Sequence, residues 1–204
     1  KFDVSLQKAR INGADLNGLR LAGDLIGKKL NLKTASVNNF AGAAISAKGT
    51  VANLNDLTGL DLSLYTKTQN LGQLAKSLKV DISKSPADIK SLEANVAGKG
   101  NANQLNFDAS VNALGGQLKA KGIAKDLLGA PSYSNLSIGV KHSNLVKAIQ
   151  IVNPGFKGQA GLNQAIDFYS KANISGKQYD LSDMKVTLGS TIFGGNLKIN
   201  AGAN

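Results

Sequence analysis

The feature that most constrains the fold of this chain is an internal repeat of about 75 residues. Such a repeat is typical of chains that place equal structural units side by side. We therefore predict one domain over residues 1–204, excised from a longer chain and built from a partial repeat (1–57) and two full repeats (58–130 and 131–204). Six residues recur 74 positions later without a gap: Leu62, Ser63, Leu64, Lys67, Asn70 and Leu71 are matched by Leu136, Ser137, Ile138, Lys141, Asn144 and Leu145.

Most of each repeat alternates apolar and polar residues. A period of two predicts β-strands with one apolar and one polar face. Leu60, Leu62 and Leu64 form one such series, and short connections such as Gly115-Gly116 and Gly194-Gly195 separate others. One-faced strands joined by tight turns favour an antiparallel meander over a buried parallel sheet.

Two segments depart from this alternation at equivalent places in the repeats. Apolar residues there have the i, i+3, i+4, i+7 spacing of an amphipathic helix. Asn70 and Asn144 precede the two stripes, where an asparagine side chain can accept a hydrogen bond from a first-turn amide. Each repeat is therefore expected to run strand, short helix, then three strands. The stripes are Leu71, Leu74, Ala75 and Leu78, and Leu145, Ala148, Ile149 and Val152.

The predicted fold is mainly β, a repeating antiparallel meander curved into a groove or taco-like sheet, with two short amphipathic helices. A sheet that is apolar on one side must bury that side against helices, a second sheet or a ligand. Two helices of about ten residues are small against so many strands. Two alternatives follow: part of the apolar face lies in an open groove, or the sheet closes into a barrel or sandwich.

No residue pattern predicts catalysis. The chain has no cysteine, and its single histidine, His142, takes the place of Thr68 in the repeat, which favours a solvated strand end over a catalytic base. Carboxylates are dispersed, and no Gly-Gly pair precedes the Lys-Ser/Thr of a phosphate loop. The sequence thus predicts a non-enzymatic protein with no cofactor and no metal site.

The formal net charge of +11 favours anionic partners. Only Arg10 and Arg20 are arginines, and the few aromatic residues are not interleaved with the basic ones. Because nucleic-acid binding draws on arginine and on stacking aromatics, a nucleic-acid partner is not expected. No stretch is long and apolar enough for a membrane-spanning helix.

The apolar strand face is the best candidate for a binding surface. Taken one at a time, its residues favour an ordinary core position over a ligand contact. The candidates for a lipid-binding groove are Leu62, Leu64, Leu105, Phe107, Val111, Leu136, Ile138, Val186, Leu188 and Leu197.

Several segments resemble the AsmA family (AsmA/TamB-like proteins) of the Gram-negative cell envelope. The similarity lies in Leu30–Leu32 with Phe40–Gly49, in Asn70–Leu74 after a strand, and in Asn196–Ile199. The similarity covers most of the chain, especially from Asp24 to the end, and rests on the order and periodicity of these motifs. The resemblance implies a periplasmic piece of an inner-membrane-anchored protein, without its N-terminal anchor, that contributes to a repeating β-groove.

Two functions follow from these expectations. In the first, the module binds phospholipid or another acyl lipid and conducts it along the apolar groove between inner and outer membrane. In the second, it is a scaffold for outer-membrane biogenesis that contacts envelope proteins through its strand edges.

Overall fold

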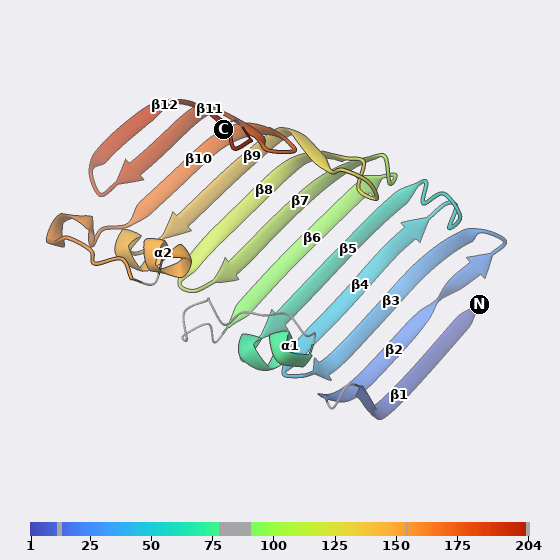
Figure 1. The fold of residues 1–204 in the computed structure, drawn as a ribbon. Helices are drawn as coiled ribbons and strands as arrows, with labels where there is room; N and C mark the ends of the chain where they lie inside the picture. The colour runs from blue at the N-terminus through green and yellow to red at the C-terminus, as the bar shows by residue number, and fades with distance from the viewer. Residues whose placement is uncertain (12–13, 78–90, 154, 203–204) are drawn as a thin grey trace. The chain divides into compact units, whose positions relative to one another are not determined.

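The computed structural model describes residues 1–11, 14–77, 91–153 and 155–202. These group into two compact units, unit 1 (Lys1–Asn101) and unit 2 (Ala102–Asn204) (Figure 1). Unit 1 contains β1 (Phe2–Ile11), β2 (Ala14–Ile26), β3 (Lys29–Phe40), β4 (Ala43–Val51), β5 (Leu60–Thr68), α1 (Leu71–Ser77) and β6 (Leu92–Gly100). Unit 2 contains β7 (Gln104–Ala113), β8 (Gly116–Lys125), β9 (Ser132–His142), α2 (Leu145–Val152), the 3₁₀ turn η1 (Ala160–Leu162), β10 (Ile166–Ser175), β11 (Gln178–Leu188) and β12 (Thr191–Asn200).

The predicted antiparallel meander is confirmed. Strand order in the sheet follows the sequence from β1 to β12, and the sheet does not close into a barrel. Within each unit every strand pairs antiparallel with the next, as β4 does with β5 and β8 with β9. The closed-barrel alternative is therefore wrong, and the fold is mainly β with two short helices.

The element order predicted from the repeat is also confirmed. β5 is followed by α1 and then β6, β7 and β8, and β9 is followed by α2 and then β10, β11 and β12. The two sets of elements occupy equivalent places along the chain because equivalent residues start and stop them. The division between the units falls after β6, inside the first full repeat.

Both helices begin at the predicted asparagines. The Asn70 side-chain oxygen accepts a hydrogen bond from the Gln73 amide at 3.0 Å, and the Asn144 oxygen accepts one from the Lys147 amide at 3.0 Å. Each bond satisfies an amide that has no partner within the helix, which stabilises the start of the helix. Leu74 of the first stripe is buried, whereas Leu78 lies outside the described residues.

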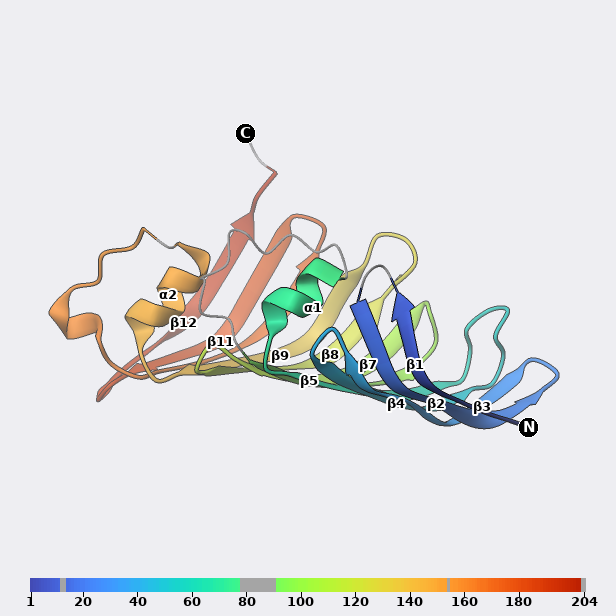
Figure 2. The same ribbon diagram turned by 90° about the horizontal axis from the view of Figure 1, so that it is seen from below.

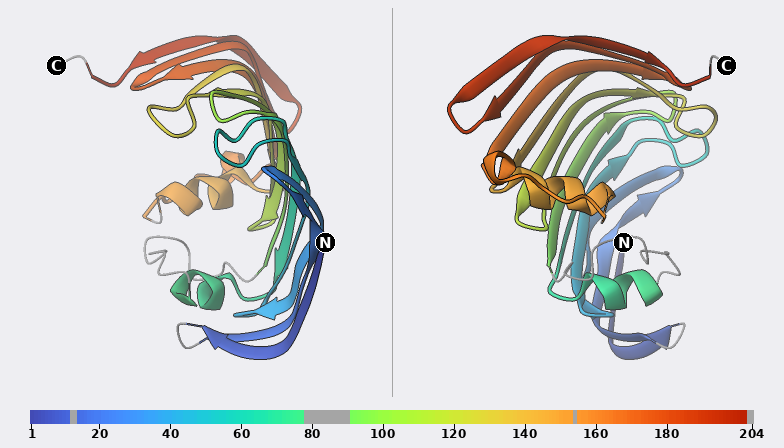
Figure 3. Two further views of the ribbon diagram at one scale, coloured as in Figure 1. Left: turned by 90° about the vertical axis from the view of Figure 1, so that its right-hand side faces the viewer. Right: turned by 60° about the vertical axis from the view of Figure 1, so that its left-hand side comes forward.

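The core of unit 1 is small and built around alanine. Leu74 of α1 packs with Ala14, Ala41 and Ala43, and Phe40, Ile45 and Leu71 pack against this cluster. Figures 2 and 3 show α1 on the concave side of the unit 1 strands and α2 on the concave side of the unit 2 strands. Because the helices are short, each covers only one end of its own strands. Neither has the length and apolar character required to cross a bilayer.

Candidate functional site

The register of unit 1 assembles its apolar residues into rows that cross all six strands. Directly opposed residues of an antiparallel pair lie on the same face of the sheet, so the pairings can be followed from strand to strand. Leu64, the fifth residue of one row and the midpoint of β5, is 44% exposed. Two neighbouring rows are Val4, Leu21, Ala35, Ala47, Leu64 and Val96, and Leu6, Leu19, Val37, Ile45, Thr66 and Ala94.

Unit 2 has the same organisation. Its rows cross β7 to β12 and place apolar side chains from six strands on one face. Bulges in β8–β9, β9–β10 and β10–β11 interrupt the register without exchanging the faces over most of the strand length. Two rows are Val111, Leu118, Val140, Phe168, Val186 and Phe193, and Leu105, Ala124, Tyr133, Ile174, Tyr179 and Ile199.

Ion pairs lie on the opposite face. In unit 2, Lys141 Nζ is 2.7 Å from Asp167 Oδ2, and these residues alternate along their strands with apolar-face residues. Lys121–Asp108 and Lys198–Asp180 are likewise directly opposed pairs. In unit 1, Lys67–Glu93 and Lys99–Asp61 have this arrangement. Each pair is exposed and adds little stability. Together the charged side chains make this face polar and hydrated.

The structure places all ten groove candidates on these apolar faces. Leu62 and Leu64 lie in unit 1, and the other eight lie in unit 2. Register brings Val111 and Val186 into one row, although 75 residues separate them. Leu136 differs from the rest because only 5% of its surface is exposed, so it is a core residue and not an accessible contact. The candidates in unit 2 are Leu105, Phe107, Val111, Leu136, Ile138, Val186, Leu188 and Leu197.

Sequence reasoning missed several residues that complete the rows. Phe168 on β10 bridges Val140 and Val186. Its strand contains the bulge at Tyr169–Lys171, and the apolar series there includes Ser170. Alternation alone therefore indicated only weakly that this strand has an apolar face. The pairing of β10 with both of its neighbours is what places Phe168 on the apolar face of unit 2.

A cleft of about 540 Å³ lies at one end of the apolar face of unit 2. Tyr133, Tyr179 and Ile199, which form the last row of that face, line it together with Lys125 and Lys198. The Tyr133 ring is held edge-on to Phe107, with ring centroids 6.2 Å apart. Apolar surface thus meets charged side chains at this strand end, where Lys198 is paired with Asp180 and Lys125 adds a further positive charge.

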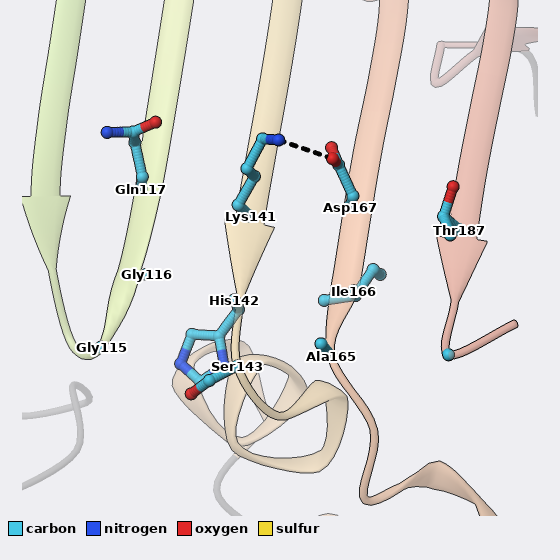
Figure 4. Close-up of a pocket in the computed structure, with 11 residues that line it drawn as sticks. Gly115, Gly116, Gln117, Lys141, His142, Ser143, Ala165, Ile166, Asp167 and Thr187 are labelled. Carbon is cyan, nitrogen blue, oxygen red and sulfur yellow. Dashed lines mark ion pairs between the residues drawn. The ribbon is translucent and has the colours of Figure 1, made fainter.

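His142 lies at the opposite strand end of unit 2, beside a cleft of about 400 Å³ (Figure 4). Its ring accepts a hydrogen bond from the Asn144 amide at Nδ1 (2.9 Å), so Nε2 carries the proton and donates to the Leu114 carbonyl oxygen (2.8 Å). The residue is only 6% exposed. The expectation of a solvated strand end is therefore wrong, because the ring links the β7–β8 turn to the cap of α2.

Thr68 makes the equivalent link in unit 1. Its hydroxyl donates to the Gly42 carbonyl oxygen at 2.9 Å and accepts from the Asn70 amide at 2.9 Å. Thr68 is also buried. Two different side chains thus perform one task at equivalent places of the repeat: each joins the preceding hairpin turn to the first residue of a helix. This shared geometry assigns His142 a structural role.

A polar cleft of about 620 Å³ lies against β1, β2 and β3 of unit 1 and contains Asp24 and Lys33. Asp24 Oδ2 is 3.0 Å from Lys33 Nζ. Its other oxygen, Oδ1, is buried and receives no hydrogen bond from any described residue. The hydrogen bond from Lys33 holds the pKa of Asp24 below its ordinary value of 3.8, against the opposing effect of desolvation.

We expect Asp24→Asn to remove a pH-dependent part of the stability. A carboxyl whose pKa is lowered by folding contributes its full stabilisation above the unfolded pKa and loses it as the pH falls through the folded pKa. The urea midpoints of wild type and variant should therefore differ at pH 7 and converge below the ordinary value of 3.8. Lys33→Gln should produce the same convergence. A difference that stays constant from neutral to acidic pH would contradict the assignment.

No group of three or more histidine or acidic side chains in the described ranges is close enough to hold a metal ion. Comparisons with family models, with curated proteins and with solved structures find no match to this chain. The class defined by the fold and the site is thus an open antiparallel meander whose units each present an apolar face with exposed side chains.

Proposed function

We propose that the chain binds phospholipid or another acyl lipid along its apolar strand faces and is a periplasmic module of an AsmA-like protein. The observation that carries this proposal is the exposure of apolar side chains such as Leu64 in the middle of a strand face, opposite a face bearing ion pairs. Large exposed apolar surfaces mark sites that bind an apolar partner. The resemblance to the AsmA family supports the same class of ligand and the location between the two membranes.

An acyl chain suits this surface because the rows offer no specific polar contact. Each buried methylene contributes about 0.8 kcal/mol wherever it lies on a uniformly apolar face. A chain that moves along the face exchanges equivalent contacts, whereas a chain that leaves it loses all of them. The barrier to sliding is therefore lower than the barrier to release, and conduction needs no catalytic residue. Lys125, which lines the cleft of unit 2, provides positive charge for an anionic headgroup, whereas Lys198 is paired with Asp180.

The proposal predicts that Leu64→Asp abolishes lipid binding while Ser63→Asp does not. Both substitutions add one negative charge to β5, but Leu64 is on the apolar face, and Ser63 is on the opposite face, paired with Lys48. A carboxylate among acyl chains is costly because it loses its hydration. Native mass spectrometry of the intact chain, with extraction of copurified lipid, should show at least a tenfold loss of occupancy for Leu64→Asp only.

Circular dichroism and thermal unfolding should first show that both variants keep the wild-type fold. Equal lipid occupancy of the two variants, or a wild-type protein that neither retains nor takes up phospholipid, would reject the proposal. In that case the apolar rows would be covered by protein.

A scaffold function is the second candidate, and the exposure of β12 favours it. Every residue of this last strand is exposed, and β11 is its neighbour in the sheet order. A strand edge of this kind can accept a strand from another protein. Under this alternative, Ile192→Pro, on the face of β12 opposite the apolar rows, would remove a protein partner from pull-downs and leave lipid occupancy unchanged.

A further inference from the structure

Unit 1 presents a compact group of apolar and basic side chains at one end of its strands. Ile26, in the last position of β2, is 75% exposed, and its neighbour Leu25 is also exposed. Lys28, which follows Gly27 in the β2–β3 turn, and Lys29, the first residue of β3, are both exposed. Leu54, from the β4–β5 connection, is a further exposed apolar residue. We call these five residues the apolar tip.

The two connections that form the apolar tip are held together. The Leu54 amide donates to the Lys28 carbonyl oxygen at 2.9 Å. Figure 1 shows both connections at the same end of the unit 1 strands. Leu25 and Ile26 are successive residues of β2 and point to opposite faces of the strand. With Leu54 on the adjoining connection, exposed apolar side chains therefore surround this end of the strands.

The conformation of the β4–β5 connection is fixed by polar contacts. Asp56 Oδ1 accepts hydrogen bonds from the Thr58 hydroxyl at 2.9 Å and the Thr58 amide at 3.3 Å, and Asp56 Oδ2 accepts one from the Asn53 side chain at 3.1 Å. Because these hydrogen bonds already fix the conformation of the turn, it loses little conformational entropy when it binds a surface. The carboxylate is also occupied within the turn, which limits its repulsion of an anionic surface.

Unit 2 has a comparable connection between β8 and β9. Asp126 accepts a hydrogen bond from the Ala130 amide at 3.1 Å and precedes Leu127 and Leu128, both exposed. Leu128 is 78% exposed, more than any other large apolar residue in the described ranges. The sequence Asp-Leu-Leu-Gly here parallels Asp-Leu-Thr-Gly over residues 56–59. A turn braced by an aspartate is thus a repeated feature of the chain, and an exposed leucine lies at or beside it in both units, as Leu54 in unit 1 and as Leu127 and Leu128 in unit 2.

The chemistry of the apolar tip matches the surface of an anionic phospholipid bilayer. Apolar side chains flanked by lysines insert at the acyl boundary while the ammonium groups remain among the headgroups. Lys28 and Lys29 form no ion pair within the described residues, so their charges are available to headgroup phosphates. We propose that the apolar tip docks unit 1 onto an anionic phospholipid membrane surface. This inference is separate from lipid binding on the strand faces.

The absence of tryptophan from the sequence makes a direct test possible. The full chain carrying Ile26→Trp should show emission shifted to shorter wavelength with phosphatidylcholine/phosphatidylglycerol vesicles, and quenching by brominated acyl chains. Ile192→Trp is the matched control, because Ile192 is also an exposed isoleucine (61%) but lies on β12, on the face opposite the apolar rows. Its emission should not change.

Flotation of the same vesicles measures the affinity. Leu25→Ser combined with Ile26→Ser should lower the partition coefficient by about tenfold or more, because two apolar side chains no longer leave water. Lys28→Gln with Lys29→Gln should weaken binding to anionic vesicles about tenfold or more and leave the weak binding to pure phosphatidylcholine unchanged. Ile192→Ser should float as wild type does.

Three results would overturn the proposal: wild type that does not float with anionic vesicles, a tip variant that floats as well as wild type, or equal emission shifts at positions 26 and 192. If the apolar tip instead bound a protein, wild type would not float with protein-free anionic vesicles. The Leu64→Asp variant should still dock. Docking and strand-face lipid binding can therefore fail independently.

Discussion

Gly49→Ala is expected to lower the free energy of unfolding by about 3 kcal/mol, because the added methyl group meets neighbouring backbone at a φ that alanine rarely adopts. Gly49 has a φ of +142°, and a Cβ there would lie 2.0 Å from the Asp61 carbonyl oxygen and 2.8 Å from Leu62 Cα. Both obstacles are backbone of the adjacent strand, so relief requires the β4–β5 pairing to separate. Urea unfolding followed by circular dichroism measures the loss.

Two other glycines provide controls for this prediction. Gly122 takes the place of Gly49 in the next repeat, and a Cβ added there would lie 2.9 Å from Leu136 Cα. Its φ is outside the left-handed region, so Gly122→Ala should cost less than Gly49→Ala. A Cβ at Gly195 on β12 would meet nothing within 4 Å, so Gly195→Ala should be neutral or slightly stabilising. Equal urea midpoints for the variants at positions 49 and 195 would contradict the close approach of β4 and β5.

Thr68→Val and His142→Ala are each expected to destabilise the protein by about 2 kcal/mol. Each removes a side chain that bridges a turn carbonyl and a helix-cap amide, and leaves both backbone groups without that partner at a buried position. The effect should appear as a lower urea midpoint together with loss of helical signal, because the start of α1 or α2 depends on the same contact.

The matched control is Thr66→Val on the same strand as Thr68. The Thr66 hydroxyl donates one longer hydrogen bond, 3.2 Å to the Ala44 carbonyl oxygen, so its loss should cost about 1 kcal/mol or less. His142→Thr should recover part of the stability lost in His142→Ala, since threonine performs this task in the other repeat. If His142→Thr were no more stable than His142→Ala, the equivalence of the two bridges would be wrong.

The fold could be predicted largely because its signals are local. Alternation along β5 and β9 predicted strands with one apolar face, and Asn70 and Asn144 marked the helix starts. Each signal is carried by residues close in sequence, and the repeat shows it twice. An open meander needs few pairings between distant parts of the sequence, since within each unit each strand pairs with its neighbour in the chain.

The candidate site could be predicted only in part because its membership depends on register. Alternation alone predicts that the side chains of Leu64 and Val111 lie on the apolar face. Leu136 was placed on the correct face, but its burial depends on packing that alternation does not specify. The hydrogen bond from His142 to Leu114 joins residues 28 positions apart, and the bridge can be recognised only when the turn and the cap are seen together.

Pairing between sequence neighbours also bears on how the chain acquires its structure. Because the strands of each unit join partners that precede or follow them directly, most contacts close short loops, so the relative contact order is low for an all-β protein. Formation of one hairpin provides the template for the next strand, as in solenoid repeats that grow from any nucleus. We therefore expect refolding faster than that of β-sandwiches of similar length, and we expect strands to pair in the order in which the ribosome releases them.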